Sequence, residues 1–430
     1  MLVDCGMFQG QREERRRNWS RFPVDASTID AVVLTHAHID HSGWLPRLVD
    51  EGFSGAVYCT PGTADLLELL LPDAAHLQEE EARYANKKGS SRHSPALPLF
   101  TARDAQRALD ALTVVDLHEV TTIAAGIEVT FRRAGHILGA ASVLMTVDDR
   151  GARRRVFFSG DVGRPNDSVM LPPEPIPSAD HIVTESTYGD RNHEAIDVEA
   201  TLADVVGRTI ARGGSVLIPV FAVGRAQTVL HALGNLREAG RIPRVPIVLN
   251  SPMAIDATEL YTRHRSEHRL TTEQCARMWN EVEYTRSVEE SIALTRRREP
   301  MIILSASGMA TGGRVLHHLL QLAPDARNTI MFVGYQAAGT RGHALVNGAK
   351  LVRVYGEDVP LDAEVVHLDA LSAHADRDEL LTWLGSCPEP PRHTWVVHGE
   401  PETAAAFADA IAADLGWSTH VPAYGERIVL

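Results

Sequence analysis

Short apolar runs bounded by turn residues dominate the first part of the chain. Such runs occupy residues 31–34, 127–132, 141–147 and 156–158, and each has the length of one buried or half-buried strand. A long helical pattern at 62–84 lies between the first run and the later ones. The pattern therefore predicts a sheet of several short strands with helices packed beside it.

The pattern changes after residue 180. Strand-like runs now alternate with amphipathic helices, for example a strand at 216–218 followed by a helix at 225–239. Alternation at this spacing predicts a mostly parallel sheet with helices on its faces. From residue 351 the runs are again β-rich. We therefore predict one domain formed by residues 1–187 and 351–430, interrupted by an α/β domain at 188–350.

Composition limits the cellular context. The 430 residues carry a formal net charge of −14, which argues against a surface that binds nucleic acid over its whole area. No stretch approaches the ~18 consecutive apolar residues of a membrane span, and no signal peptide is visible. The four cysteines stand far apart without a CxxC pair, which excludes a thiolate zinc finger. We expect a cytoplasmic protein without membrane attachment.

The densest chemistry in the sequence is a histidine cluster directly after the first apolar run. Four ligand-type residues fall within six positions: His36, His38, Asp40 and His41. Because side chains alternate along an extended chain, His36 and His38 are expected to point the same way. Asp40 and His41 follow as the chain turns into a helix and can reach a second position. This ligand density suits two zinc ions about 3.5–4 Å apart.

Further ligand-type residues follow other apolar runs. His136, Asp161 and His398 each stand just after a predicted strand, where a side chain can reach an open edge of a sheet. Asp161 is predicted to bridge the two ions, and a hydroxide between them would be the nucleophile. The predicted ligand sets are His36, His38 and His136 for one zinc, and Asp40, His41 and His398 for the other.

These motifs resemble those of the metallo-β-lactamase superfamily and, within it, the β-CASP nucleases. Residues 36–41 fit the HxHxDH signature of the superfamily. The resemblance implies an α/β fold, a metallo-β-lactamase αββα sandwich with an inserted α/β β-CASP domain. Asp4 matches the aspartate of the first superfamily motif, and residues 184–189 resemble motif A of the β-CASP nucleases. Residues 372–376 resemble motif B, and residues 397–400 resemble motif C in the histidine form that RNA-processing members carry.

The resemblance also implies roles for residues outside the ligand sets. His374, the motif B histidine, would protonate the leaving oxygen or stabilise the phosphate, and Glu185 would hold its imidazole oriented and protonated. Asp4 would orient a metal ligand rather than bind metal itself. Asp40, His374 and Glu185 form the predicted catalytic set.

Polar loops in the inserted segment follow successive strand-like runs. Arg225 begins a predicted helix, and Ser251 and Ser307 stand in equivalent loops. Recurrence of such loops favours one anion-binding edge of the predicted sheet. We predict Arg225, Ser251 and Ser307 as phosphate contacts, with simple packing of the loops as the alternative.

The ligand pattern predicts two zinc ions per chain, and the resemblance to the β-CASP nucleases implies a zinc-dependent ribonuclease. It would hydrolyse phosphodiester bonds of single-stranded RNA endonucleolytically, in RNA processing or decay, and 5′-exonuclease activity stays open. Two alternatives remain: a small-molecule metallo-hydrolase such as a thioesterase of the glyoxalase II type, and an inactive RNA-binding relative. The sequence leaves the oligomeric state undecided, and a homodimer is one option. Family members carry roughly 25 residues, the length of a strand pair, before the residue matching Asp4. Either the start codon is placed too late, which we expect, or the chain lacks these two strands.

Overall fold

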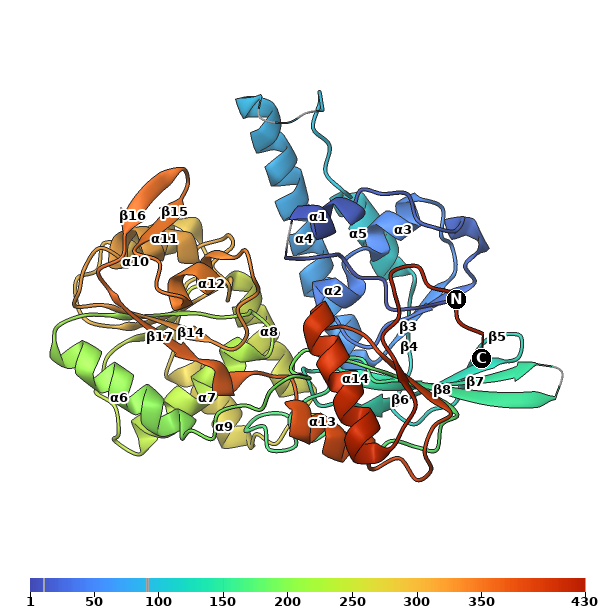
Figure 1. Cartoon of the computed structure of the whole chain (residues 1–430). Helices are drawn as coiled ribbons and strands as arrows, with labels where there is room; N and C mark the ends of the chain where they lie inside the picture. The colour runs from blue at the N-terminus through green and yellow to red at the C-terminus, as the bar shows by residue number, and fades with distance from the viewer. Residues whose placement is uncertain (11, 90, 92, 150, 430) are drawn as a thin grey trace. The chain divides into compact units, whose positions relative to one another are not determined.

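The computed structural model describes residues 1–10, 12–89, 91, 93–149 and 151–429 (Figure 1). The chain forms two compact units, and each is described by itself. The first comprises Met1–Asn192 and His374–Leu430, and the second comprises His193–Ala373. The first unit is therefore assembled from two segments that are far apart in the sequence.

The first unit contains two sheets. The four-stranded sheet has the order β1-β2-β3-β4 with all strands parallel: β1 (Leu2–Val3), β2 (Ala31–Val33), β3 (Ala56–Cys59) and β4 (Leu112–Val114). The seven-stranded sheet has the order β19-β18-β9-β8-β7-β6-β5 and is antiparallel from β5 to β8 and parallel from β8 to β19. Its strands are β5 (Thr121–Ala124), β6 (Ile127–Arg133), β7 (Ala141–Asp149), β8 (Ala152–Phe158), β9 (His181–Thr184), β18 (His393–Val396) and β19 (Thr419–His420).

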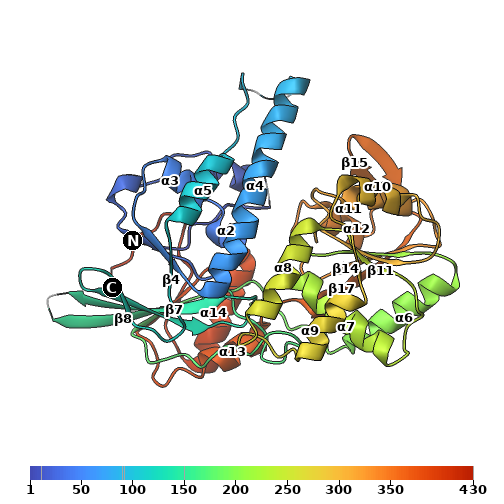
Figure 2. The same ribbon diagram turned by 180° about the vertical axis from the view of Figure 1, so that it is seen from behind.

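The two sheets pack face to face. Val33 of β2, Phe131 of β6 and Val143 of β7 are fully buried in one apolar cluster between them. A second cluster joins Ile182 of β9 to Phe407, so helices cover the other face of the larger sheet. Figures 1 and 2 show the helices α3, α4 and α5 beside the smaller sheet. The αββα sandwich is thus confirmed, with helices α1 (Arg12–Arg17), α2 (Ile39–Ser42), α3 (Leu45–Asp50), α4 (Pro61–Lys88), α5 (Ala102–Asp110), α13 (Arg377–Leu384) and α14 (Pro401–Leu415).

The second unit is built on a six-stranded parallel sheet of order β12-β11-β13-β10-β14-β17. The strands are β10 (Val216–Pro219), β11 (Ile247–Leu249), β12 (Glu283–Tyr284), β13 (Ile302–Ser305), β14 (Thr329–Val333) and β17 (Glu364–Leu368), with a separate hairpin of β15 (Leu351–Val354) and β16 (Glu357–Pro360). The helices are α6 (Val198–Ala211), α7 (Arg225–Glu238), α8 (Pro252–Arg263), α9 (Thr272–Asn280), α10 (Val288–Thr295), α11 (Val315–Leu322) and α12 (Arg341–Val346). Among the described residues of either unit, no helix combines the length and apolarity that crossing a bilayer requires.

The second boundary of the inserted unit differs from the predicted one. The structure divides the chain after Ala373, whereas the sequence pattern placed the division at residue 350. β17 pairs in parallel with β14 over its whole length, and Val352 and Val354 of the hairpin join the core of the inserted unit. An apolar run reveals a strand but not the sheet that the strand joins, so the pattern alone assigned residues 351–373 to the first unit.

Candidate metal centre

The segment after β2 places four ligand-type side chains at one edge of the smaller sheet. His38 precedes the short helix α2, which carries Asp40 and His41. His36 Nε2 and His38 Nδ1 lie 3.1 Å apart. The two imidazoles therefore converge, as alternation along an extended chain predicts.

The first residues of the chain hold α2 in place. The backbone N–H of Cys5 donates to the carbonyl of His41 over 2.7 Å, and that of Met7 donates to the carbonyl of Ile39 over 2.9 Å. A Cβ at Gly6 would lie 1.5 Å from the carbonyl oxygen of Asp40, so only glycine permits this approach. The chain around Gly6 thus fixes the helix that carries Asp40 and His41.

One cluster of ligand atoms comes from three segments of the first unit. His36, His38, His136 and Asp161 each offer an atom within 4.8 Å of the others. His136 Nε2 lies 3.2 Å from His38 Nδ1. Asp161 Oδ2 lies 3.5 Å from His36 Nε2 and 3.6 Å from His136 Nε2. The segments after β2, β6 and β8 therefore meet at one point.

The second cluster lies on the other side of Asp161. It comprises Asp40, His41 and His398, with 3.0 Å between the Nε2 atoms of the two histidines. Asp161 Oδ1 lies 3.2 Å from His41 Nε2 and 3.4 Å from His398 Nδ1. The two oxygens of one buried carboxylate thus face different clusters, and Oδ1 has no hydrogen-bond partner among the residues that the structure describes.

The separations fit a tetrahedral metal shell. Ligand atoms bonded to zinc at about 2.0–2.1 Å in tetrahedral geometry lie roughly 3.3 Å apart. The first cluster shows 3.1, 3.2, 3.5 and 3.6 Å between its ligand atoms. Imidazole nitrogens with a carboxylate oxygen form a donor set that zinc accepts. The residues present therefore fit a bound divalent ion.

Charge in the two clusters is unequal without metal. Burial lowers the pKa of His36 and brings that of His38 to about 4, so both are neutral near pH 7. Burial also opposes the charged form of His398, but the Asp161 and Asp40 carboxylates outweigh it and raise the pKa of His398 to about 9. Because ligands bind metal through unprotonated nitrogens, loading the second cluster must release a proton from His398.

Asp4 contacts a ligand residue rather than the cluster centre. Its Oδ2 lies 2.7 Å from His41 Nδ1, and its Oδ1 accepts the backbone N–H of Thr35 over 2.7 Å. The N–H of His41 on Nδ1 therefore points to Asp4, and His41 Nε2 faces the second cluster. Asp4 adopts a φ of 60°, which few non-glycine residues do.

Glu185 and His374 form a pair beside the clusters. His374 Nδ1 lies 3.2 Å from both carboxylate oxygens of Glu185, whose side chain is 1% exposed. Glu185 also accepts the backbone N–H of Val162 over 2.6 Å. Burial lowers the pKa of His374, but the Glu185 carboxylate outweighs it and raises that pKa above its usual value. The imidazole is thereby held from its Nδ1 side.

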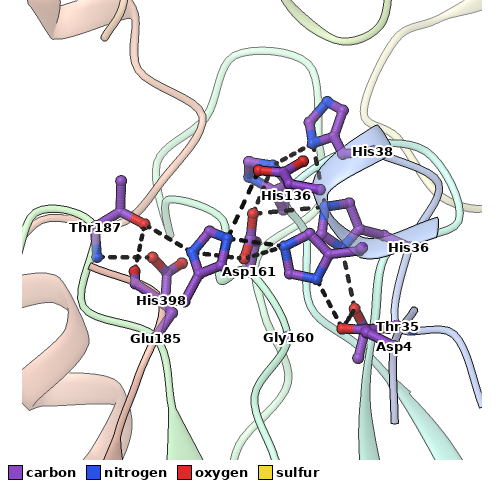
Figure 3. Close-up of polar contacts among 12 residues, drawn as sticks. Asp4, Thr35, His36, His38, His136, Gly160, Asp161, Glu185, Thr187 and His398 are labelled. Atoms are coloured by element: carbon purple, nitrogen blue, oxygen red, sulfur yellow. Dashed lines mark hydrogen bonds and ion pairs between the residues drawn. The ribbon is translucent and has the colours of Figure 1, made fainter. Parts of the chain in front are cut away.

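Two threonines at the centre were absent from the predicted set. Thr35 Oγ1 lies 3.1 Å from His36 Nδ1, and Thr187 Oγ1 lies 3.2 Å from His398 Nδ1 (Figure 3). Thr35 adjoins a ligand in the sequence, but Thr187 lies 211 residues from His398. Threonine is common in turns and strands, so no spacing in the sequence distinguishes Thr187.

The three predicted phosphate contacts lie in the second unit, at one edge of its parallel sheet. Arg225 starts α7 and is buried, and Ser251 caps α8 by accepting the N–H of Ala254. Ser307 accepts the N–H of Thr311 over 3.0 Å. The three residues follow β10, β11 and β13, whose carboxyl ends adjoin in the sheet. Both serine hydroxyls already take part in local hydrogen bonds.

Metal binding is expected to stabilise the protein against unfolding. An ion that binds only the folded state adds about 2.7 kcal/mol per site at a concentration 100 times its Kd. Adding zinc to chelator-treated protein should therefore raise the unfolding temperature, measured by scanning calorimetry. Magnesium, which prefers oxygen ligands, should give a smaller rise. Equal unfolding temperatures with and without zinc would count against a metal site in these clusters.

Comparison with known families assigns three parts of the chain. The model for the metallo-beta-lactamase superfamily matches residues 1–195, and that for the Beta-Casp domain matches residues 226–345. Residues 358–422 match a family described as a Zn-dependent metallo-hydrolase RNA specificity domain.

Several curated proteins are similar along nearly the whole chain. A Thermus thermophilus protein named as a ribonuclease is 38% identical over 100% of this chain and 94% of its own length. An RNase J-like protein of Methanocaldococcus jannaschii is 31% identical, with 99% and 93% covered. Transcription termination factor FttA of Pyrococcus abyssi is 33% identical over 94% of this chain, which spans 62% of FttA. Among solved structures, an Enterococcus faecalis protein of unknown function has the same fold, with a TM-score of 0.51, 15% identity, and coverage of 93% of this chain and 81% of that one.

Proposed function

The chain belongs to the β-CASP group of the metallo-β-lactamase superfamily, and on that basis we propose that it is a metal-dependent ribonuclease. The observation that carries the proposal is Asp161, whose two oxygens face two separate groups of ligand-type side chains. RNA as the substrate is supported by the name of the Thermus relative and by the description of the family that matches residues 358–422.

Two zinc ions per chain are part of the proposal. When bound, a zinc pair lowers the pKa of a water molecule towards neutrality and neutralises charge on phosphoryl oxygens. Asp161 would give one oxygen to each ion, and Asp40 would add a carboxylate at the more exposed side of the second cluster. The proposed holders are His36, His38 and His136 for one ion, and Asp40, His41 and His398 for the other.

His374 is the proposed proton donor of the reaction. Its Nδ1 faces Glu185, and we propose that Nε2 on the other side of the ring acts on the oxygen that leaves or on the phosphate that reacts. A carboxylate partner keeps the imidazolium form populated, and it also fixes the plane of the ring. Glu185 would therefore act by holding His374 oriented and charged.

Arg225 is proposed to bind a phosphate of the RNA, together with Ser251 and Ser307. Losing one hydrogen bond to a charged group costs about 1.5–3 kcal/mol, so Arg225→Ala should raise KM roughly 10–100-fold with kcat little changed. The slope of log affinity against log salt concentration should also fall by about 1, the contribution of one phosphate contact. The measurement is steady-state cleavage at several salt concentrations. Arg327→Ala, which removes an exposed arginine paired with Asp325 in the same unit, is the matched control. An unchanged KM for Arg225→Ala would remove this residue from the proposed RNA contacts.

The endonucleolytic mode is tested with circular RNA. A circular single-stranded RNA has no ends, so the protein loaded with zinc should linearise it, whereas an exonuclease would leave it intact. Linear RNA with a 5′ phosphate serves as the comparison substrate. Cleavage of the linear RNA alone would refute the endonucleolytic mode but would still support the proposed ribonuclease activity.

The same preparation separates the alternative functions. A thioesterase would turn over a glutathione thioester and leave both RNAs uncut, and that result would refute the proposed activity. An inactive RNA-binding relative would bind RNA without cutting it and would hold no zinc. Light scattering on the same sample measures the oligomeric state and so tests whether the chain forms a homodimer. We propose the cytoplasm as the compartment, which suits four buried free cysteines.

A further inference from the structure

Packing fixes the side chain of His398 less firmly than the side chains of His36, His136 and His41. Its side chain is 31% exposed, compared with 0% for His36, 1% for His136 and 7% for His41. It follows β18 with a φ of 53°, a left-handed backbone conformation that is uncommon for histidine. Hydrogen bonds must therefore supply the orientation that burial supplies to these three buried rings.

Thr187 makes two contacts with His398 (Figure 3). Its Oγ1 lies 3.2 Å from His398 Nδ1 and 3.3 Å from the carbonyl oxygen of His398. Asp161 Oδ1 lies 3.4 Å from the same Nδ1. The other ring nitrogen, Nε2, is 3.0 Å from His41 Nε2 and 3.7 Å from Asp40 Oδ2, so it faces the second cluster.

The proton positions follow from what each group can donate. A threonine hydroxyl has one proton, and a carbonyl oxygen can only accept. If Thr187 donates to the carbonyl of His398, its oxygen is left to accept a proton from Nδ1–H. The Asp161 carboxylate near the same nitrogen can also only accept. We propose that Thr187 is a positioning residue that holds His398 in the tautomer with the proton on Nδ1, which leaves Nε2 free to bind metal.

The first cluster contains the same arrangement in a fully buried setting. Thr35 Oγ1 donates to Asp4 Oδ2 over 2.9 Å and so accepts from Nδ1–H of His36 over 3.1 Å. This tautomer leaves His36 Nε2 without a proton on the side that faces its cluster. A threonine hydroxyl thus serves one histidine in each cluster, but only His398 lacks the burial that would hold its ring without the hydroxyl.

The loop from Glu185 to Thr187 therefore acts on two imidazoles. Glu185 holds His374, Thr187 holds His398, and Ser186 Oγ between them donates to the carbonyl of Val397 over 2.8 Å. Ser186 joins the loop to the backbone next to His398, and within the described part of the chain its hydroxyl has no hydrogen bond to a ring. Substitution of Ser186 therefore separates a specific effect of the Thr187 hydroxyl on His398 from a general loosening of the loop. A general loosening would follow from loss of the Ser186 hydroxyl as well.

The test is zinc affinity rather than catalysis. Loss of a group that orients a metal ligand typically lowers metal affinity 10–100-fold. Thr187→Val, which keeps the shape and removes the hydroxyl, should weaken one of two zinc sites by that factor in competition with a chromophoric chelator. Thr187→Ser should bind like the wild type, and Ser186→Ala should leave both affinities unchanged. With cobalt in place of zinc, Thr187→Val should alter the visible absorption of one site.

The outcomes separate this inference from the proposed metal centre on which it rests. Equal zinc affinities for the wild type and Thr187→Val, with equal cobalt spectra, overturn the role of Thr187 alone. A wild-type chain that binds no second ion overturns the centre as well. If Thr187→Val loses its cooperative unfolding transition without metal, Thr187→Ala and Thr187→Ser decide: a weakened site in the alanine variant alone supports the inference, and equal affinities overturn it.

Discussion

Replacing Asp161 with asparagine is expected to leave at most one tightly bound zinc ion per chain and to lower RNA cleavage by about 10³-fold or more. Asparagine keeps one carbonyl oxygen but replaces the other oxygen with an NH₂ group, which cannot bind metal. Since Oδ1 and Oδ2 of Asp161 face different clusters, one cluster must lose its carboxylate. Loss of several kcal/mol of charge stabilisation from a catalytic ion corresponds to about this factor in rate.

Metal analysis after gel filtration, together with single-turnover cleavage of labelled RNA, measures both effects. Asp110→Asn is the matched control, because it makes the same chemical change at an exposed carboxylate that accepts a hydrogen bond from Gln106. It should keep two ions and full activity. An Asp161→Asn variant with two tightly bound ions would show that the carboxylate does not bridge the clusters.

His374→Ala is expected to keep both ions and to lower kcat about 10²–10⁴-fold, the usual contribution of general acid–base catalysis. The expected separation of metal content from rate follows from the structure, since His374 belongs to neither ligand cluster and is held by Glu185. Glu185→Gln should lower kcat less, because the amide still accepts a hydrogen bond from Nδ1–H.

The measurements are zinc content and kcat on the same preparations. His118→Ala, which removes an exposed histidine near Glu174 in the same unit, should change neither quantity. A His374→Ala variant that loses zinc would assign His374 to metal binding. Full activity in that variant would exclude it as the proton donor.

The sequence predicted the ligand-type residues because simple chain geometry brings them together. His36 and His38 converge through alternation along one extended segment, and His136 and Asp161 each follow a strand of the larger sheet. Residues just after strands reach the edge of a sheet wherever the strands lie, so the pattern needed no knowledge of the strand order.

Thr187 could not be predicted in the same way. Its contact with His398 exists because β9 and β18 pair in parallel, with Thr184 opposite Val396, which brings the two following loops side by side. That register depends on contacts between segments separated by the whole inserted unit. The boundary after Ala373 has the same cause, because β17 shows which sheet it joins only through its pairing with β14.

The insertion sets the order in which a ribosome can complete this protein. The second unit is one continuous segment, so it can fold as it emerges, whereas the first unit must wait for His374 and His398. At about 5–20 residues per second, these histidines arrive roughly 10–50 s after Asp161. On the proposed function, an unfinished chain would carry an incomplete centre beside the messenger RNA that encodes it. Translation thus delays nuclease activity until the segment that carries His374 and His398 has been read.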